Sequence, residues 1–234
     1  GTATPNEKVT GETLDGSLNV VKQVLQPVLL NRDFKNWNSI LNTVKTCIVY
    51  NTAAKAAVEI ALFQLKAKEN GESLVNLLGS NKGTLKTDYT ISIGSDNHRI
   101  SEAQKLVNDG FTSIKIKLGN NSVNHDIKTI KKISDTIGPN IALRIDCNQA
   151  WTYKDTLKAG RIWARDNLNI DFIEQPVLKD AISDLIRLTE LSPYPIMADE
   201  SVASYKNAIN LINNHACDYI NIKLMKTGGL SEAI

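Results

Sequence analysis

The sequence predicts an α/β fold, in which a (β/α) barrel of parallel strands follows a helical segment. Three observations predict it. Short apolar runs alternate with amphipathic helical stretches from residue 87 onward. Residues 14–79 instead repeat apolar side chains every three or four positions and contain no convincing strand. Charged residues recur where the apolar runs of the second part end, as they do at the carboxyl face of a parallel barrel.

The helical segment is clearest in TAAKAAVEIALFQLKAKENG, residues 52–71. Its alanines allow close packing of a helix. Thr52 is expected to cap the helix, and Asn70 with Gly71 to end it. We predict that this first, helical part of the chain extends to residue 86.

Six strands are predicted in the second part, residues 87–234. The runs are TDYTISIG (87–94), FTSIKIKLG (111–119), IALRIDCN (141–148), NIDFIEQP (169–176), YPIMADES (194–201) and CDYINIKLM (217–225). Between the first two, ISEAQKLVNDG predicts a helix in which Ser101 and Gln104 fit a capping box. Strands that alternate with helices are typical of right-handed βαβ units and a parallel sheet.

Two lysines occupy alternate positions of the second strand. Lys115 and Lys117 should point to one face, and Ile114, Ile116 and Leu118 to the other. Taken alone, this pattern is more typical of the solvated face of an edge strand than of a functional site. The residues at the ends of the other strands decide whether this lysine-bearing face is solvated or belongs to a functional site.

Carboxylates end the next three strands, at Asp146, Glu174 and Asp199. Three converging carboxylates would repel one another and raise their pKa values, and a hard divalent cation such as Mg²⁺ removes this repulsion. We therefore predict a Mg²⁺ site formed by these three residues. Asn148 and Glu200 are expected to support it from close by.

Lys223 lies near the end of the sixth run. We expect Lys117 and Lys223 to face each other across the metal with a substrate between them, which suits proton abstraction next to a carboxylate. The glycine pair that follows in KTGGL either lets the backbone approach a ligand or forms a tight turn.

Composition excludes several other classes. Lysine and arginine (27) nearly balance aspartate and glutamate (25), so the net charge of +2 does not indicate a nucleic-acid partner. No apolar run approaches the ~20 residues that span a bilayer, and the polar N-terminus does not resemble a signal peptide, so we expect no membrane partner and a cytoplasmic location. Neither GxGxxG nor GxxxxGK[ST] occurs, and three scattered cysteines are expected to stay reduced.

The motifs together resemble those of the enolase superfamily, in its muconate-lactonizing-enzyme subgroup. The matching motifs are the KxK of KIK, the DxN of DCN, EQP, ADES and the lysine of NIKLMKTGG, in the family's order. The resemblance covers nearly the whole chain. Within the subgroup, VTGETLDG, AAKAAVEIAL and INIKLMKTGGL are most similar to dipeptide epimerases of the L-Ala-D/L-Glu type.

The resemblance implies a TIM-type barrel modified to (β/α)7β, with residues 1–86 as the helical portion of an α+β capping domain and residues 87–234 as the first six barrel units. It implies Mg²⁺-dependent epimerisation of a dipeptide by 1,1-proton transfer through an enediolate. Lys117 and Lys223 would be the acid/base catalysts. Lys115 and Thr90 would contact the substrate carboxylate or modulate the base. The metal ligands would be Asp146, Glu174 and Asp199.

Residues 87–234 are fewer than the ~200 that a complete barrel needs, so we expect a longer enzyme that also holds the seventh and eighth strands and the strands of the capping domain. The expected partner is a small molecule, a dipeptide or N-acyl amino acid carboxylate, in a homo-oligomeric enzyme. Alternatives with the same lysines and metal are o-succinylbenzoate synthase, N-acylamino acid racemase and muconate cycloisomerase. An alternative of another class is a catalytically inactive fragment that binds metal or a protein.

Overall fold

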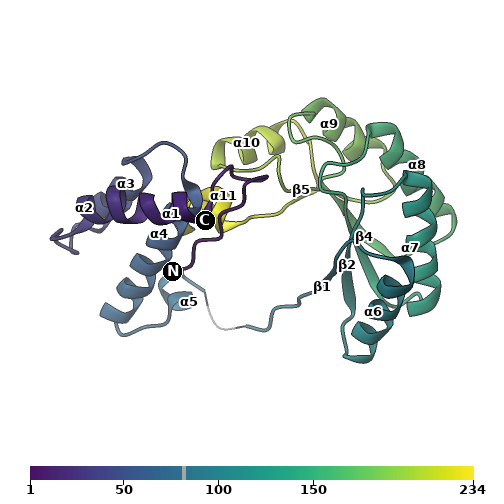
Figure 1. Ribbon diagram of the computed structural model, residues 1–234, viewed down its shortest axis with the longest axis horizontal. Coiled ribbons are helices and arrows are strands. Elements are labelled where there is room, and N and C mark those ends of the chain that lie inside the picture. The colour runs from purple at the N-terminus through teal and green to yellow at the C-terminus, as the bar shows by residue number, and fades with distance from the viewer. Residues whose placement is uncertain (81–82) are drawn as a thin grey trace. The chain divides into compact units, whose positions relative to one another are not determined.

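The computed structural model describes residues 1–80 and 83–234, which fall into two compact units (Figure 1). The first consists of Gly1–Thr84, Ala203–Tyr205 and Ile222–Ile234, and the second of Leu85–Val202 and Lys206–Asn221. The segment that carries Lys223 therefore belongs to the first unit. The assignment of residues 1–86 to a capping domain and of 87–234 to a barrel stays a prediction.

The second unit contains a sheet of six parallel strands in chain order, which confirms the predicted fold class. Helices alternate with the strands, and in Figure 1 helices α6 to α9 lie along the outer side of the curved sheet. In chain order the elements are β1 (Tyr89–Ile91), α6 (Asp96–Asn108), β2 (Ser113–Lys117), α7 (Val123–Ile137), β3 (Ala142–Asp146), α8 (Tyr153–Arg165), β4 (Ile170–Glu174), α9 (Ile182–Leu191), β5 (Ile196–Ala198), α10 (Tyr205–Asn213) and β6 (Tyr219–Ile220).

The core of this unit lies between the sheet and its helices. Ile114 and Ile116 of β2 are fully buried, and Leu118 is 2% exposed, as the alternation of β2 predicts. They belong to one cluster with helix residues such as Ile130 and Trp163. Full burial of one such aliphatic side chain contributes about 1.5–3 kcal/mol, so this apolar face fixes which way the opposite, lysine-bearing face of β2 points.

A register shift separates the lower and upper halves of the β3–β4 pair. Leu143 pairs with Ile170, but the next residue, Arg144, pairs with Phe172, so one extra residue lies in β4. After the shift, Asp146 is paired with Glu174. Had the first offset continued, Asp146 would be paired with Ile173, which belongs to the apolar core on the outer side. The bulge therefore aligns the two carboxylates.

Two predicted helix starts are wrong. Helix α6 begins at Asp96, where the Ser95 side chain accepts a hydrogen bond from the His98 amide, so Ser101 lies inside the helix and caps nothing. Helix α4 (Thr52–Glu69) is preceded by Asn51 in a left-handed conformation, and a carboxylate from elsewhere, Glu12, accepts from the Ala53 amide at 3.1 Å. A distant acceptor thus performs the role expected of a local cap. Asn70 ends α4 as predicted.

The first unit is helical apart from its connecting segments. Its elements are α1 (Leu14–Val20), the π-helical turn η1 (Val21–Leu25), α2 (Gln26–Leu29), α3 (Trp37–Thr46), α4, α5 (Leu74–Leu77), α11 (Leu224–Thr227) and α12 (Leu230–Ala233). Leu25, Val44 and Ala54 form its buried core. The buried Lys55 of α4 donates to the Lys45 carbonyl near the end of α3 at 2.8 Å, where an ammonium complements the helix dipole.

The glycine pair of KTGGL forms a turn against α4. Gly228 and Gly229 both have positive φ, 84° and 141°. Beyond them, Ser231 donates its amide and its hydroxyl to the Glu59 carboxylate, at 3.1 and 2.7 Å. A Cβ on Gly229 would overlap that carboxylate. The pair therefore serves close packing within the first unit, which favours the tight-turn interpretation.

Gly229→Ala should destabilise the chain by about 2–4 kcal/mol, because it combines overpacking against Glu59 with a backbone conformation that only glycine adopts readily. Gly94→Ala is the matched control, since a Cβ there makes only an ordinary contact, 3.7 Å from His98. The measurement is thermal unfolding of both variants, in which each kcal/mol shifts the midpoint by about 2–4 °C for a chain of this size. Equal midpoints would contradict the packing described here.

Within residues 1–80 and 83–234, no helix is both long and apolar enough to cross a membrane.

The three cysteines are free, as expected, and Cys147 is completely buried. Burial raises the pKa of the Cys147 thiol well above its usual value, and the nearby carboxylate of Asp146 raises it further, so this thiol stays protonated.

Candidate active site

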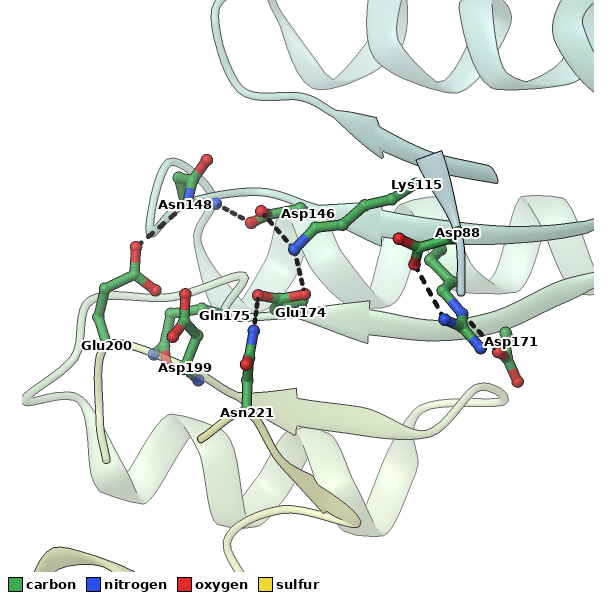
Figure 2. Close-up of polar contacts among 11 residues, drawn as sticks. Asp88, Lys115, Asp146, Asn148, Asp171, Glu174, Gln175, Asp199, Glu200 and Asn221 are labelled. Atoms are coloured by element: carbon green, nitrogen blue, oxygen red, sulfur yellow. Dashed lines mark hydrogen bonds and ion pairs between the residues drawn. The ribbon is translucent and has the colours of Figure 1, made fainter. Parts of the chain in front are cut away.

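Carboxylates from three adjacent strands gather at the carboxyl end of the sheet. Asp146 and Glu174 are the last residues of β3 and β4, and Asp199 follows β5 directly. Their exposed fractions are only 2%, 1% and 1%. Figure 2 shows the three side chains projecting from neighbouring strand ends toward a common region. The three residues that the sequence predicts as metal ligands therefore lie buried at the ends of three adjacent strands, and their role as ligands stays a prediction.

Lys115 lies between two of these carboxylates. Its Nζ is 2.6 Å from Glu174 Oε2 and 3.0 Å from Asp146 Oδ2 (Figure 2). Burial alone lowers the pKa of Lys115, but the charges of Asp146 and Glu174 and their hydrogen bonds raise it above its usual value. Because the side chain is 14% exposed and doubly paired, it does not belong to the solvated face of an edge strand.

One ammonium does not balance the two carboxylates. Burial, and then repulsion from Asp146, raises the pKa of Glu174, although Lys115 and the amide of Asn221 oppose the shift. Asn221 follows β6 and donates from Nδ2 to Glu174 Oε1 at 2.9 Å (Figure 2). When both are ionised, Asp146 and Glu174 carry one more charge than the ammonium between them, which favours binding of a further cation.

Asn148 and Glu200 continue the polar cluster. The Asn148 amide donates to Asp146 Oδ1 at 3.0 Å, and its side chain donates to Glu200 Oε1 at 3.2 Å (Figure 2). The other Glu200 oxygen, Oε2, is buried without a hydrogen-bond partner in the described structure. Burial, together with the charge of Asp199, raises the pKa of Glu200. These contacts connect both residues to Asp146, and their supporting role at a metal site stays a prediction.

The donor set fits a hard divalent cation. Its members are carboxylates, the ligands that Mg²⁺ prefers. In the geometry described for residues 1–80 and 83–234, no group of three or more histidine, cysteine, aspartate or glutamate side chains is close enough to hold a metal ion, and Lys115 lies between Asp146 and Glu174. A bound ion would have to share Asp146 and Glu174 with this ammonium.

The backbone around Lys117 is held from outside the sheet. Arg99 of α6, 2% exposed, donates from Nη2 to the Lys117 carbonyl at 2.9 Å. Asp126 of α7, equally buried, accepts from the Gly119 amide at 3.1 Å. Burial raises the pKa of Asp126, against the opposing effect of the Gly119 amide. Helices α6 and α7 thus fix the carboxyl end of β2, where Lys117 stands in register with Asp146.

Two further predicted site residues are Thr90, in the second unit, and Lys223, in the first. Thr90 of β1 is the register neighbour of Lys115, and its contact with a substrate stays a prediction. Lys223 immediately precedes α11 in the first unit and lines a cleft of about 570 Å³ with residues such as Thr2, Ile60 and Met225. The prediction that Lys223 and Lys117 act as a catalytic pair stays a prediction.

Sequence reasoning missed an ion-pair cluster deeper in the sheet. Arg144 binds Asp171 through Nε and Asp88 through Nη1, both at 2.9 Å, and it lies over the Phe172 ring. Figure 2 shows Asp88 and Asp171 on the two sides of this guanidinium. The signal was present, because Arg144 precedes Asp146 by two residues and so shares its face of the strand. Asn221 likewise precedes Lys223 by two residues in the predicted sixth strand. Alternation in that strand would therefore have placed Asn221 on the same face as the lysine.

Comparison with known proteins agrees with this geometry. The chain matches the family described as "Enolase C-terminal domain-like" over residues 98–234. Over residues 4–79 it matches the family described as "Mandelate racemase / muconate lactonizing enzyme, N-terminal domain". The two matches together include the helical first part and all strands from β2 onward.

Named relatives are epimerases and racemases. The L-Ala-D/L-Glu epimerase of Bacillus subtilis is 37% identical over the whole chain, which spans 64% of that protein, and its substrate-liganded structure superimposes with a TM-score of 0.96 over 99% of this chain. A dipeptide epimerase from Enterococcus faecalis, solved with Mg and the dipeptide L-Leu-L-Tyr, gives 0.93 at 35% identity, with 99% of this chain and 64% of that chain covered. The N-succinyl-L-Arg/Lys racemase of Bacillus cereus is 32% identical over the whole chain and 63% of its own length. The chain belongs to the mandelate racemase/muconate lactonizing enzyme subgroup of the enolase superfamily.

Proposed function

We propose that this chain is the greater part of a Mg²⁺-dependent dipeptide epimerase of the L-Ala-D/L-Glu type. The observation that carries the proposal is the row of buried carboxylates at the ends of β3, β4 and β5, two of which hold Lys115 of β2 between them. The L-Ala-D/L-Glu epimerase of Bacillus subtilis and the Mg-bound dipeptide epimerase of Enterococcus faecalis support the substrate class and the metal.

In the proposed reaction, one lysine, Lys117 or Lys223, takes the proton from the substrate α-carbon. The electron pair of the broken C–H bond moves into the adjacent carboxylate, and an enediolate forms. The other lysine gives a proton to the opposite face of the α-carbon, so the configuration is inverted and the two lysines exchange protonation states. No oxidant or reductant is needed.

Each site residue has a proposed part in holding this geometry. Asp146, Glu174 and Asp199 would hold Mg²⁺, which when bound supplies positive charge where the substrate carboxylate becomes more negative. Lys115 keeps Asp146 and Glu174 paired and can also contact the substrate carboxylate. Asn221 orients Glu174, and Arg99 with Asp126 fixes the backbone that carries Lys117.

The test is ¹H NMR of L-Ala-L-Glu in D₂O with the purified chain and MgCl₂. We expect deuterium to enter the glutamate α-position as the opposite epimer accumulates, and we expect both to stop when EDTA removes the metal. A parallel sample with an N-succinyl amino acid tests the racemase alternative, which the relative from Bacillus cereus supports. If neither substrate exchanges its α-proton, this chain does not catalyse the proposed reaction.

A further inference from the structure

The side chain of Gln175 is completely buried and uses its full hydrogen-bonding capacity. Its Nε2 donates to the Val177 carbonyl at 3.0 Å and to Ser201 Oγ at 2.8 Å. Its Oε1 accepts from the amides of Asp199, at 2.9 Å, and Ser201, at 3.1 Å. A carboxamide offers two donor hydrogens and two acceptor lone pairs, so these four bonds saturate it.

These bonds join two loops that carry candidate metal ligands. Gln175 directly follows Glu174 at the end of β4, and its partners Asp199 and Ser201 belong to the loop after β5. Ser201 Oγ also donates to the Lys179 carbonyl at 2.8 Å, which returns the connection to the β4 loop. The two loops are therefore tied at the point where the two carboxylates leave the backbone.

The main chain of Gln175 extends the connection on both sides. Its amide donates to the Met197 carbonyl of β5, and its carbonyl accepts from the Gln149 amide in the loop after β3, both at 2.8 Å. Gln175 and Gln149 both have positive φ, 34° and 70°. Residues other than glycine keep such a conformation only where the surroundings impose it, and this pattern is concentrated at functional sites.

We propose that Gln175 is a positioning residue, which fixes the Asp199 backbone relative to Glu174 and thereby sets the affinity of this carboxylate site for a divalent cation. The metal part of this inference rests on the proposed function. Gln175 itself is completely buried, and its side chain bonds to the Asp199 amide rather than to a metal. Groups that orient metal ligands in this way typically change metal affinity 10–100-fold when they are replaced.

The principal variant is Gln175→Met, which keeps the length of the side chain and removes all four bonds. Ser201→Ala is the milder variant, because it removes the hydroxyl partner of Nε2 but leaves both amide bonds to Oε1. Gln104→Met, at an exposed position of α6, is the matched control. The two readouts are backbone amide hydrogen exchange of the metal-free chain and the Kd for Mn²⁺ measured by calorimetry.

For Gln175→Met, we expect the amides of Asp199 and Ser201 to exchange at least about tenfold faster, while the amides of β2 and β3 keep their protection. The Kd for Mn²⁺ should rise about 10–100-fold. Ser201→Ala should change both quantities in the same direction by less, and Gln104→Met should change neither.

Faster exchange throughout the second unit would assign Gln175 a merely structural role and overturn the inference. So would an unchanged Kd for Mn²⁺ in a Gln175→Met variant whose Asp199 amide exchanges faster. If the wild-type chain bound no Mn²⁺, the proposed function would fail, while the local exchange of Asp199 would still decide whether Gln175 positions that residue. The two failures are therefore distinguishable.

Discussion

Methionine in place of Lys115 is expected to lower the free energy of unfolding of the metal-free chain by about 3–5 kcal/mol. The substitution keeps most of the apolar volume but removes the ammonium that Asp146 and Glu174 share at 3.0 and 2.6 Å. Two carboxylates that are almost inaccessible to water would then face each other without a counter-charge. The measurement is urea unfolding in EDTA, followed by tryptophan fluorescence, since Trp151 and Trp163 both belong to the core of this unit.

Adding excess MgCl₂ to the Lys115→Met variant should restore a substantial part of the lost stability, because a cation that binds only the folded state stabilises it by mass action. Lys128→Met, at an exposed position of α7, should change stability by no more than about 0.5 kcal/mol. A loss below about 1 kcal/mol for Lys115→Met would mean that the ammonium is not what holds the two carboxylates together.

Alanine at Lys117 or at Lys223 is expected to reduce epimerisation of L-Ala-L-Glu by about 10²–10⁴-fold, the usual contribution of a general acid or base. In the proposed mechanism, each of the two lysines is needed for the complete inversion, because one removes the proton and the other returns it. Each variant should nevertheless continue to exchange deuterium into the epimer that the remaining lysine serves. This split between exchange and epimerisation would not arise from a general loss of structure.

The measurement is the time course of both signals by ¹H NMR in D₂O, with Lys128→Ala as a control that should keep wild-type rates. Circular dichroism establishes that each variant is folded. If a variant epimerises the dipeptide at a rate within threefold of the wild type, the lysine that it lacks is not one of the two acid/base catalysts. This result would leave the carboxylate site itself unaffected.

Much of the second unit could be predicted from the sequence because its signals are local. Alternation in SIKIKLG places Ile114 and Ile116 in the core and both lysines on the opposite face, and the structure confirms the burial of these isoleucines. Carboxylates at successive strand ends converge because parallel strands share one carboxyl edge. These two arguments need no information about distant contacts.

The parts that could not be predicted depend on contacts between distant segments. Glu12 caps α4 in place of the expected Thr52, although forty residues separate them. Gln175 adopts a positive φ, so strand alternation does not give the direction of its side chain. The ion pairs of Lys115 with Asp146 and Glu174 were not predicted, because they depend on the register of three separate strands. The predicted contact of Lys115 with a substrate carboxylate, or its effect on the base, stays a prediction.

In a regular strand pair, a single register offset would have to serve both the apolar packing of β3 against β4 and the alignment of their carboxylates. The extra residue in β4 gives each of these its own offset. Below the shift, the offset between β3 and β4 brings Leu143 beside Ile170, and above it the offset brings Asp146 beside Glu174. The two halves of this strand pair are thus out of phase by one residue. Selection can alter the apolar packing of the lower half without changing which carboxylates become neighbours in the upper half.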